Sequence, residues 1–104
     1  MTSPEAKPLE LVCPAGTPAA LRAAAEAGAD AIYCGLANET NARNFPGLNF
    51  SPEELAEGVA FAHRKGSRVL VAINTFARAG DVGLWREAVD TAAQCRADAV
   101  IAAD

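Results

Sequence analysis

Polar side chains that could bind a small molecule gather in two segments, each directly after an apolar run. Residues 35–50 form the longer segment, which is rich in asparagine and carries one cation. Amides and hydroxyls donate and accept hydrogen bonds, and a guanidinium binds carboxylate or phosphate through paired hydrogen bonds. The candidate substrate-binding residues are Asn38, Thr40, Asn41, Arg43, Asn74 and Thr75. These residue types predict binding of a polar or anionic ligand, with Arg43 as the anion-binding group.

Both segments also have a purely structural interpretation, which the sequence leaves open. Residues 35–50 could form an Ω-loop whose amides bond to its own backbone. Asn74 and Thr75 could cap exposed backbone in a turn. Residues 35–50 are longer than the usual βα connection of about 2–6 residues, and this length is compatible with both a binding loop and an Ω-loop.

The cysteine, histidine and serine residues do not form a pattern typical of nucleophilic catalysis or metal binding. Cys13, Cys34 and Cys95 form an odd set without C-x-x-C spacing, so neither a disulfide framework nor a zinc site is predicted. Cys13 and Cys34 end strands that we expect to be neighbours, which leaves open a redox or metal pair as well as small buried residues. His63, the one histidine, lies late in an expected helix, where it is interpreted as a solvated helix end. No base lies beside a serine or cysteine, so no catalytic triad, catalytic residue, metal site or cofactor ligand is assigned.

Known catalytic and phosphate-binding motifs are absent from the sequence. It contains no G-x-G-x-x-G, no P-loop, no H-E-x-x-H and no G-x-S-x-G. Glu10 interrupts the first expected strand, where a charge should pair or reach solvent, so a structural role is favoured over a catalytic one.

An internal repeat indicates the helices and strands that would position these residues. The sequence of residues 92–101 is similar to that of residues 24–33, with Asp98 at the position of Asp30, 68 positions earlier. Each copy is an Ala-rich helix, a tight turn ending in Asp and a short β-branched strand, which is typical of a parallel β/α protein. Arg96 stands where the first copy has Gly28. If that turn also requires positive φ, the arginine costs about 1 kcal/mol relative to glycine.

The full pattern predicts the order β-α-β-α-β-α-β. Strands are expected at 9–13, 31–34, 68–73 and 99–101, with Pro14 breaking the first. Helices are expected to start at the N-caps Thr17, Ser51 and Asp81, Ser51 forming a capping box with Glu54. Gly28 and Gly66 should end the first two helices. Leu55, Val59 and Ala62 are expected on the buried face of the second helix, and Trp85, Val89 and Ala92 on one face of the third.

We therefore predict an α/β fold, a partial TIM-like (β/α) barrel of four parallel strands and three helices. Residues 1–8 are expected to be a flexible N-terminus and 9–104 a half-barrel domain. An open, doubly wound sheet is the alternative. Because ligands bind at the carboxyl ends of parallel strands, both polar segments belong to the expected mouth. No helix follows the fourth strand, so we expect the sequence to be part of a larger fold.

Composition narrows the classes of partner. The 104 residues carry a net charge of −4, and the nine Lys and Arg residues are scattered along the sequence, which argues against a nucleic-acid footprint. No apolar run approaches the roughly 18 residues of a membrane span, and residues 1–8 lack the apolar core of a signal peptide. A cytoplasmic location is expected.

The first strand-loop-helix resembles the opening of peptidase family U32. The resemblance rests on E-L-V-C-P-A-G at residues 10–16 and G-A-D-A-I-Y-C-G at 28–35. Residues 40–50 and A-I-N-T-F at 72–76 resemble one branch most closely, that of the ubiquinone-biosynthesis protein UbiU. The similarity covers about residues 9–104. Relatives usually have Gly at the position of Arg96.

The resemblance implies a longer TIM-like barrel that supports oxygen-independent hydroxylation of a quinone precursor. It also implies a second U32 protein as partner, UbiV-like, and a 4Fe-4S cluster held by four cysteines from later in the full-length relatives, none of them in this sequence. Alternative functions are a collagenase-like U32 peptidase and a non-catalytic truncated fragment; this chain alone is expected to be inactive.

Overall fold

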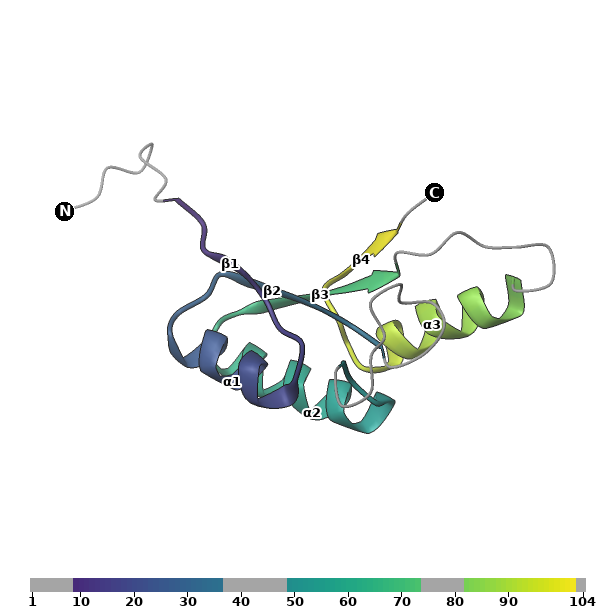
Figure 1. Cartoon of the computed structure of the whole chain (residues 1–104), viewed down its shortest axis with the longest axis horizontal. Helices are drawn as coiled ribbons and strands as arrows, with labels where there is room; N and C mark the ends of the chain where they lie inside the picture. Colours follow the sequence, from purple (N-terminus) through teal and green to yellow (C-terminus); the bar gives the residue numbers. More distant parts are fainter. Residues whose placement is uncertain (1–8, 37–48, 74–81, 103–104) are drawn as a thin grey trace.

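A computed structural model describes residues 9–36, 49–73 and 82–102 (Figure 1). The six candidate substrate-binding residues, the N-cap Asp81 and the flexible N-terminus predicted for 1–8 lie outside these ranges. The elements are β1 (Val12–Pro14), α1 (Pro18–Glu26), β2 (Ala31–Gly35), α2 (Pro52–Arg64), β3 (Arg68–Ile73), α3 (Val82–Gln94) and β4 (Ala99–Ala102). The predicted order and the α/β class are confirmed.

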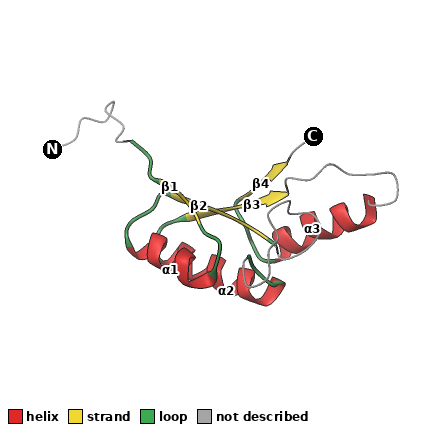
Figure 2. Cartoon of the chain, in the orientation of Figure 1, coloured by secondary structure: helices red, strands yellow, loops and turns green. Residues whose placement is uncertain are grey.

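The four strands form one parallel sheet in the order β1-β2-β3-β4. The three helices lie on the same side of this sheet (Figures 1 and 2), with α1 packed on α2 and α2 on α3. A doubly wound sheet reverses its strand order and carries helices on both faces. The sequential order and single helical layer are instead those of a segment of a β/α barrel.

The first strand differs from its prediction at both ends. Leu9 is almost fully exposed, and the strand begins only at Val12. Pro14 belongs to the strand and pairs with Tyr33 instead of breaking it. Because β1 is an edge strand of the described sheet, the missing N–H of Pro14 removes no ladder bond toward β2. The next amide, Ala15 N, donates to the carbonyl of Tyr33 at 2.9 Å and continues the pairing.

The core lies between the helices and one face of the sheet. Its largest fully buried side chains are Phe50, Leu21, Ile32, Leu55, Ile73, Val59, Val69 and Val71. The expected face of α2 (Leu55, Val59 and Ala62) is confirmed as buried. Of the expected face of α3, Ala92 is buried and Val89 is half-buried, and the side chain of Trp85 lies outside the described residues.

The opposite face of the sheet is not covered by any element that the structure describes. The continuous apolar run of β3 predicts burial on both faces, but β3 alternates between fully buried and partly exposed positions. Val12, Tyr33 and Ile101 are large apolar side chains that remain exposed. In a β/α barrel this face lines the interior.

Local capping explains where the first two helices begin. Thr17 Oγ1 accepts a hydrogen bond from Ala20 N at 3.1 Å, and Pro18 occupies the first turn. Ser51 and Glu54 form both bonds of the capping box, at 3.2 Å and 2.9 Å. These predicted N-termini are confirmed.

Three helix-to-strand turns use left-handed backbone, and one of them lacks glycine. Gly28 has φ +90° and Gly66 has φ +83°, whereas Arg96 has φ +64°. A Cβ atom is unfavourable in this region, so glycine is the preferred residue at such turns. The strain expected at Arg96 from the internal repeat is thus present.

Replacing Arg96 by glycine is expected to stabilise the protein. Arg96→Gly should raise the free energy of unfolding by about 0.5–1 kcal/mol, the net of relieved strain and a more flexible unfolded chain. Urea denaturation measures this change. The matched control Arg86→Gly, in the exposed interior of α3, should instead lower stability by about 1 kcal/mol. Equal signs for the two variants would contradict strain at Arg96.

Candidate functional site

The carboxyl ends of β2 and β3 are neighbours, which sets where the two polar segments leave the sheet. Gly35, the last residue of β2, is in register with Ala72 of β3. Residues 37–48 follow β2 and residues 74–81 follow β3, so both connections start from the same edge of the sheet. This edge is where parallel β/α proteins bind their ligands.

The longer connection leaves and re-enters the fold at adjacent points. Leu36 forms a parallel bridge with Phe50, whose amide donates to Gly35 O at 3.1 Å. Asn49 N donates to Gly16 O, which lies in the loop after β1, and Asn49 adopts φ +71°. Leu36 and Phe50 are both buried. The Phe50 end of the connection is therefore held against the loop after β1, the end of β2 and the core.

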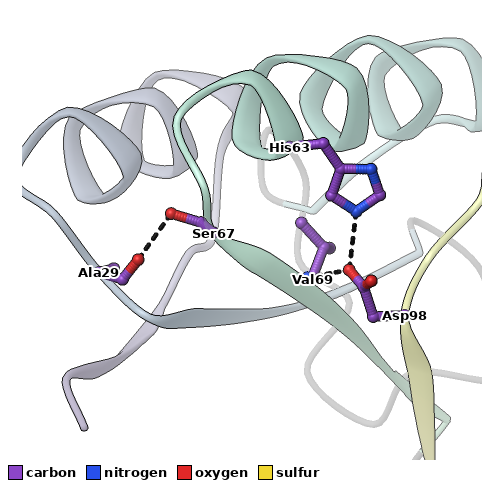
Figure 3. Close-up of polar contacts among 5 residues, drawn as sticks. All are labelled: Ala29, His63, Ser67, Val69 and Asp98. Carbon is purple, nitrogen blue, oxygen red and sulfur yellow. Dashed lines mark hydrogen bonds and ion pairs between the residues drawn. The ribbon is translucent and has the colours of Figure 1, made fainter.

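A second polar group lies at the opposite edge of the sheet. His63 Nε2, in the last turn of α2, donates to Asp98 Oδ2 at 2.8 Å (Figure 3). The same oxygen accepts from Val69 N at 2.7 Å, and Asp98 N donates to Val69 O at 2.7 Å. Asp98 thus ties α2, the start of β3 and the start of β4 together.

The electrostatic surroundings of Asp98 favour its ionised form. Partial burial by itself would raise the pKa of this carboxyl, but four other effects outweigh it. The Val69 amide and His63 donate hydrogen bonds to the carboxylate, and the charges of His63 and Arg68 add to them. The pKa of Asp98 is therefore lowered from its ordinary value.

This group has the composition of a serine-protease triad but not its geometry. Ser67 lies near His63 in sequence, yet its hydroxyl donates to Ala29 O at 2.6 Å and points away from the imidazole (Figure 3). Ser67 is also buried. A nucleophile must contact its base, so these residues cannot act as a triad. They lie at the amino ends of the strands, the edge that stabilises β/α folds and does not carry catalysis.

The first copy of the internal repeat makes the same connection. Asp30 Oδ2 accepts from Leu11 N at 2.7 Å, and Asp30 N donates to Leu11 O at 2.9 Å. In each copy the aspartate before a strand is bonded to the start of the preceding strand. The repeat therefore specifies strand registration and is structural in both places.

Sequence reasoning missed the partner of His63, which was interpreted as a solvated helix end. The imidazole is partly exposed but bonded to an aspartate 35 positions away. The repeat was the available signal, because it marks Asp98 as equivalent to Asp30. Glu10, for which a structural role was favoured, forms an ion pair with Arg68.

The three cysteines behave as packing residues. Cys13 of β1 is in register with Ile32 of β2, two residues before Cys34. The thiols of Cys13 and Cys34 are therefore not opposite each other. Burial raises the pKa of Cys34 to about 12. Burial, and to a smaller extent the charge of Glu53, raises the pKa of Cys95, whose thiol contacts Pro52 O at 3.4 Å. Protonated buried thiols are neither nucleophiles nor metal ligands.

Within residues 9–36, 49–73 and 82–102, no group of three or more His, Cys, Asp or Glu side chains is placed to hold a metal ion. In the same part of the chain, no helix is long and apolar enough to cross a membrane.

Comparison with known proteins decides the family. The model of peptidase family U32 matches residues 16–104, which include six of the seven elements. The chain belongs to peptidase family U32. The family resemblance stated from the opening motifs is confirmed.

Three relatives of this chain are named as a protease, a collagenase and a hydroxylation protein. An uncharacterized protease of Methanocaldococcus jannaschii is 40% identical over 92% of this chain, which covers 23% of that relative. A collagenase of Porphyromonas gingivalis is 33% identical over 91% of this chain, covering 23% of the relative. The tRNA hydroxylation protein P of Helicobacter pylori (strain 26695) is 36% identical over 91% of this chain, covering 22% of the relative. The chain thus spans less than a quarter of the length of these relatives.

Proposed function

We propose that this chain is the N-terminal segment of a U32 hydroxylation protein whose substrate is a quinone precursor, as in UbiU-like proteins. Residues 40–50 and 72–76 carry this proposal, because they resemble the UbiU branch. The fold adds support, since β2 and β3 are adjacent and parallel and send both segments out from one edge of the sheet. A hydroxylation protein among the relatives makes the reaction class compatible with the family.

Arg43 is proposed to bind an anionic group of the substrate, such as a carboxylate. Asn38, Thr40, Asn41, Asn74 and Thr75 would supply hydrogen bonds around it. A guanidinium offers a carboxylate two parallel hydrogen bonds, which fix its orientation as well as its position. Their proposed part in the reaction is to bind and orient the ring.

The iron-sulfur cluster expected from the resemblance does not fit the cysteines described here. Cys34 and Cys95 are buried with raised pKa values, and Cys13 is not opposite either of them. A cluster needs four thiolates around one site. We therefore assign the 4Fe-4S cluster, together with the contacts to a UbiV-like partner, to parts of the full-length protein other than these elements.

The test is anaerobic hydroxylation of a quinone precursor by the full-length protein with its U32 partner. Formation of the hydroxylated ring, measured by mass spectrometry, is expected. A full-length protein that is folded and cluster-loaded but forms no such product would overturn the proposal.

Arg43→Ala in that protein should reduce product formation at least tenfold, because it removes a charge-assisted contact worth about 1.5–3 kcal/mol. The matched control is Arg86→Ala, which removes an exposed arginine of α3. Its activity should stay within twofold of the wild type. Equal activity of the two variants would remove Arg43 from the binding site.

Hydroxylation of tRNA is the second candidate function. The name of the Helicobacter pylori relative favours it. The net charge of −4 weighs against this segment as the RNA-binding part, because phosphate backbones are bound by basic surfaces. Hydroxylated nucleosides in tRNA treated with the full-length protein, without quinone product, would favour tRNA over the quinone.

Proteolysis is less well supported, although two relatives are named as a protease and a collagenase. Within the described ranges, the His63–Asp98 pair has no serine nucleophile beside it, since the hydroxyl of Ser67 is bonded to Ala29 O. Digestion of collagen by the full-length protein would restore this candidate. A full-length protein with neither activity would leave a non-catalytic role.

A further inference from the structure

Three cationic side chains converge on one aromatic ring on the outer surface of the helical layer. The guanidinium carbon of Arg22 in α1 lies 5.4 Å from the centroid of the Phe61 ring in α2. Arg64 Cζ lies at 5.7 Å and Lys65 Nζ at 5.6 Å from the same centroid. These distances are within the range of cation–π attraction. We call Arg22, Phe61, Arg64 and Lys65 the Phe61 cluster.

The three cations of the Phe61 cluster form no ion pair within the described part of the chain. Arg22, Arg64 and Lys65 are exposed. The two ion pairs found among the described residues involve other cations, His63 and Arg68. A third of the nine Lys and Arg residues therefore gather at one ring, although they are scattered in the sequence.

Helix stability accounts for only part of this arrangement. Arg64 and Lys65 lie at the C-terminal end of α2, where the helix dipole favours positive charge. Arg22 lies in the middle of α1, before the last turn, and the helix dipole favours positive charge only in that last turn. Like-charge repulsion from the two further cations opposes the position of Arg22, and an anion bound among the three would relieve that repulsion.

We propose that the Phe61 cluster is a docking point for a short acidic segment of a partner protein. Each cationic centre lies within 6 Å of one centroid, so all three can meet two or three neighbouring carboxylates. Arginines bind carboxylates in a bidentate manner, and the partly exposed Phe61 ring offers an apolar contact beside them. Complementary charge of this kind favours encounter and specificity.

The charges around the cluster favour a short acidic segment over a nucleic acid. Glu26, one turn beyond Arg22, and Glu57, one turn before Phe61, are both exposed. An RNA strand carries a charge at every nucleotide and would extend from the cluster onto these carboxylates. A segment with only two or three acidic residues would fit within the cluster and would not reach these carboxylates.

The Phe61 cluster lies toward the other edge of the sheet from the strand ends that lead into the candidate substrate-binding segments. Lys65 and Gly66 lead into the start of β3 at Arg68, at the amino edge of the sheet. The candidate substrate-binding segments leave from the carboxyl edge. A partner bound at the cluster would therefore leave the expected mouth open.

Fluorescence anisotropy of a labelled peptide with three consecutive glutamates between Gly-Ser flanks, the triglutamate peptide, tests the proposal when the peptide is titrated with the full chain. Saturable binding that weakens with added salt is expected. Arg22→Glu combined with Arg64→Glu should weaken binding at least tenfold. The matched control, Arg86→Glu combined with Arg96→Glu, makes the same charge change at two other exposed arginines and should change binding less than threefold. Circular dichroism melts establish that each variant is folded.

Three results would overturn the proposal. The first is no binding of the triglutamate peptide by the wild-type chain, and the second is equal weakening by the two double variants. The third is a labelled ten-nucleotide uridine RNA that binds the wild type more tightly than the triglutamate peptide does and no longer binds the Arg22/Arg64 variant. That result would assign the cluster to RNA.

Discussion

Phe50→Ala is expected to lower the free energy of unfolding by about 3–5 kcal/mol, the largest loss predicted for this chain. Phe50 is the largest of the fully buried side chains. A domain of this size has a total stability of about 5–15 kcal/mol, so the variant would lose a large fraction of it.

The size of this effect follows from what the ring contacts. A Cβ atom at Gly58 would meet Phe50 Cε2 at 3.7 Å and Leu21 Cδ1 at 3.1 Å, so Gly58 leaves room where α1, α2 and the ring meet. Removing the ring opens a cavity lined from three sides, which close packing cannot refill without moving the helices. Because Phe50 also bridges Leu36, the variant should loosen the carboxyl edge of the sheet.

Urea denaturation measures the loss, and an unchanged m-value would show that the folded states are comparable. Phe50→Leu keeps most of the side-chain volume, so it should lower the free energy of unfolding less than Phe50→Ala does. It also provides the measurement if the alanine variant does not fold. Leu9→Ala, at an almost fully exposed apolar side chain, should change stability by less than about 0.5 kcal/mol. A loss below about 1 kcal/mol for Phe50→Ala would contradict the packing described here.

Local signals in the sequence were sufficient for most of the fold. The capping box of Ser51 and Glu54, the N-cap Thr17 and the glycines after α1 and α2 act over a few residues, and each occurs as predicted. Strand order and the single helical layer could not be read from such signals, because they depend on which strands pair. Pro14 was misjudged for the same reason: its cost depends on whether its strand is an edge.

The polar contacts were less predictable than the elements. His63 and Asp98 are brought together by the packing of α2 over the β3-β4 edge, and nothing within one helix indicates such a contact. The Phe61 cluster likewise joins α1 to α2. For the candidate substrate-binding residues, the sequence identified the segments and the structure describes the edge from which they leave. Their binding role stays a prediction.

The second large effect is expected at Asp98, the aspartate of the second repeat copy. Asp98→Ala should lower the free energy of unfolding at pH 7 by about 1–3 kcal/mol. The variant removes an ionised acceptor from His63 and leaves the part-buried amide of Val69 without its side-chain partner. Its side chain is about one-third exposed, so water replaces some of the lost bonding and the lower half of this range is expected.

The pH dependence separates the charge of Asp98 from its hydrogen bond. The folded-state pKa of Asp98 is lowered from 3.8, so the unfolded chain takes up the proton first as pH falls. The stabilisation from ionised Asp98 is therefore present above about pH 4 and is lost as pH falls through the folded-state pKa. Asp98→Asn keeps an oxygen that can accept from Val69 N but removes the charge, so its stability deficit relative to wild type should shrink below pH 4.

Urea denaturation of wild type, Asp98→Asn and Asp98→Ala between pH 3 and pH 7 provides the measurement. Asp90→Asn is the matched control, because Asp90 is exposed on α3 and makes no hydrogen bond or ion pair to another described residue. It should change stability by less than about 0.5 kcal/mol at each pH. An Asp98→Asn deficit that stays constant across this pH range would show that the carboxylate charge contributes nothing. If Asp98→Ala is as stable as Asp98→Asn, the hydrogen bond from Val69 N to the side chain contributes nothing to stability.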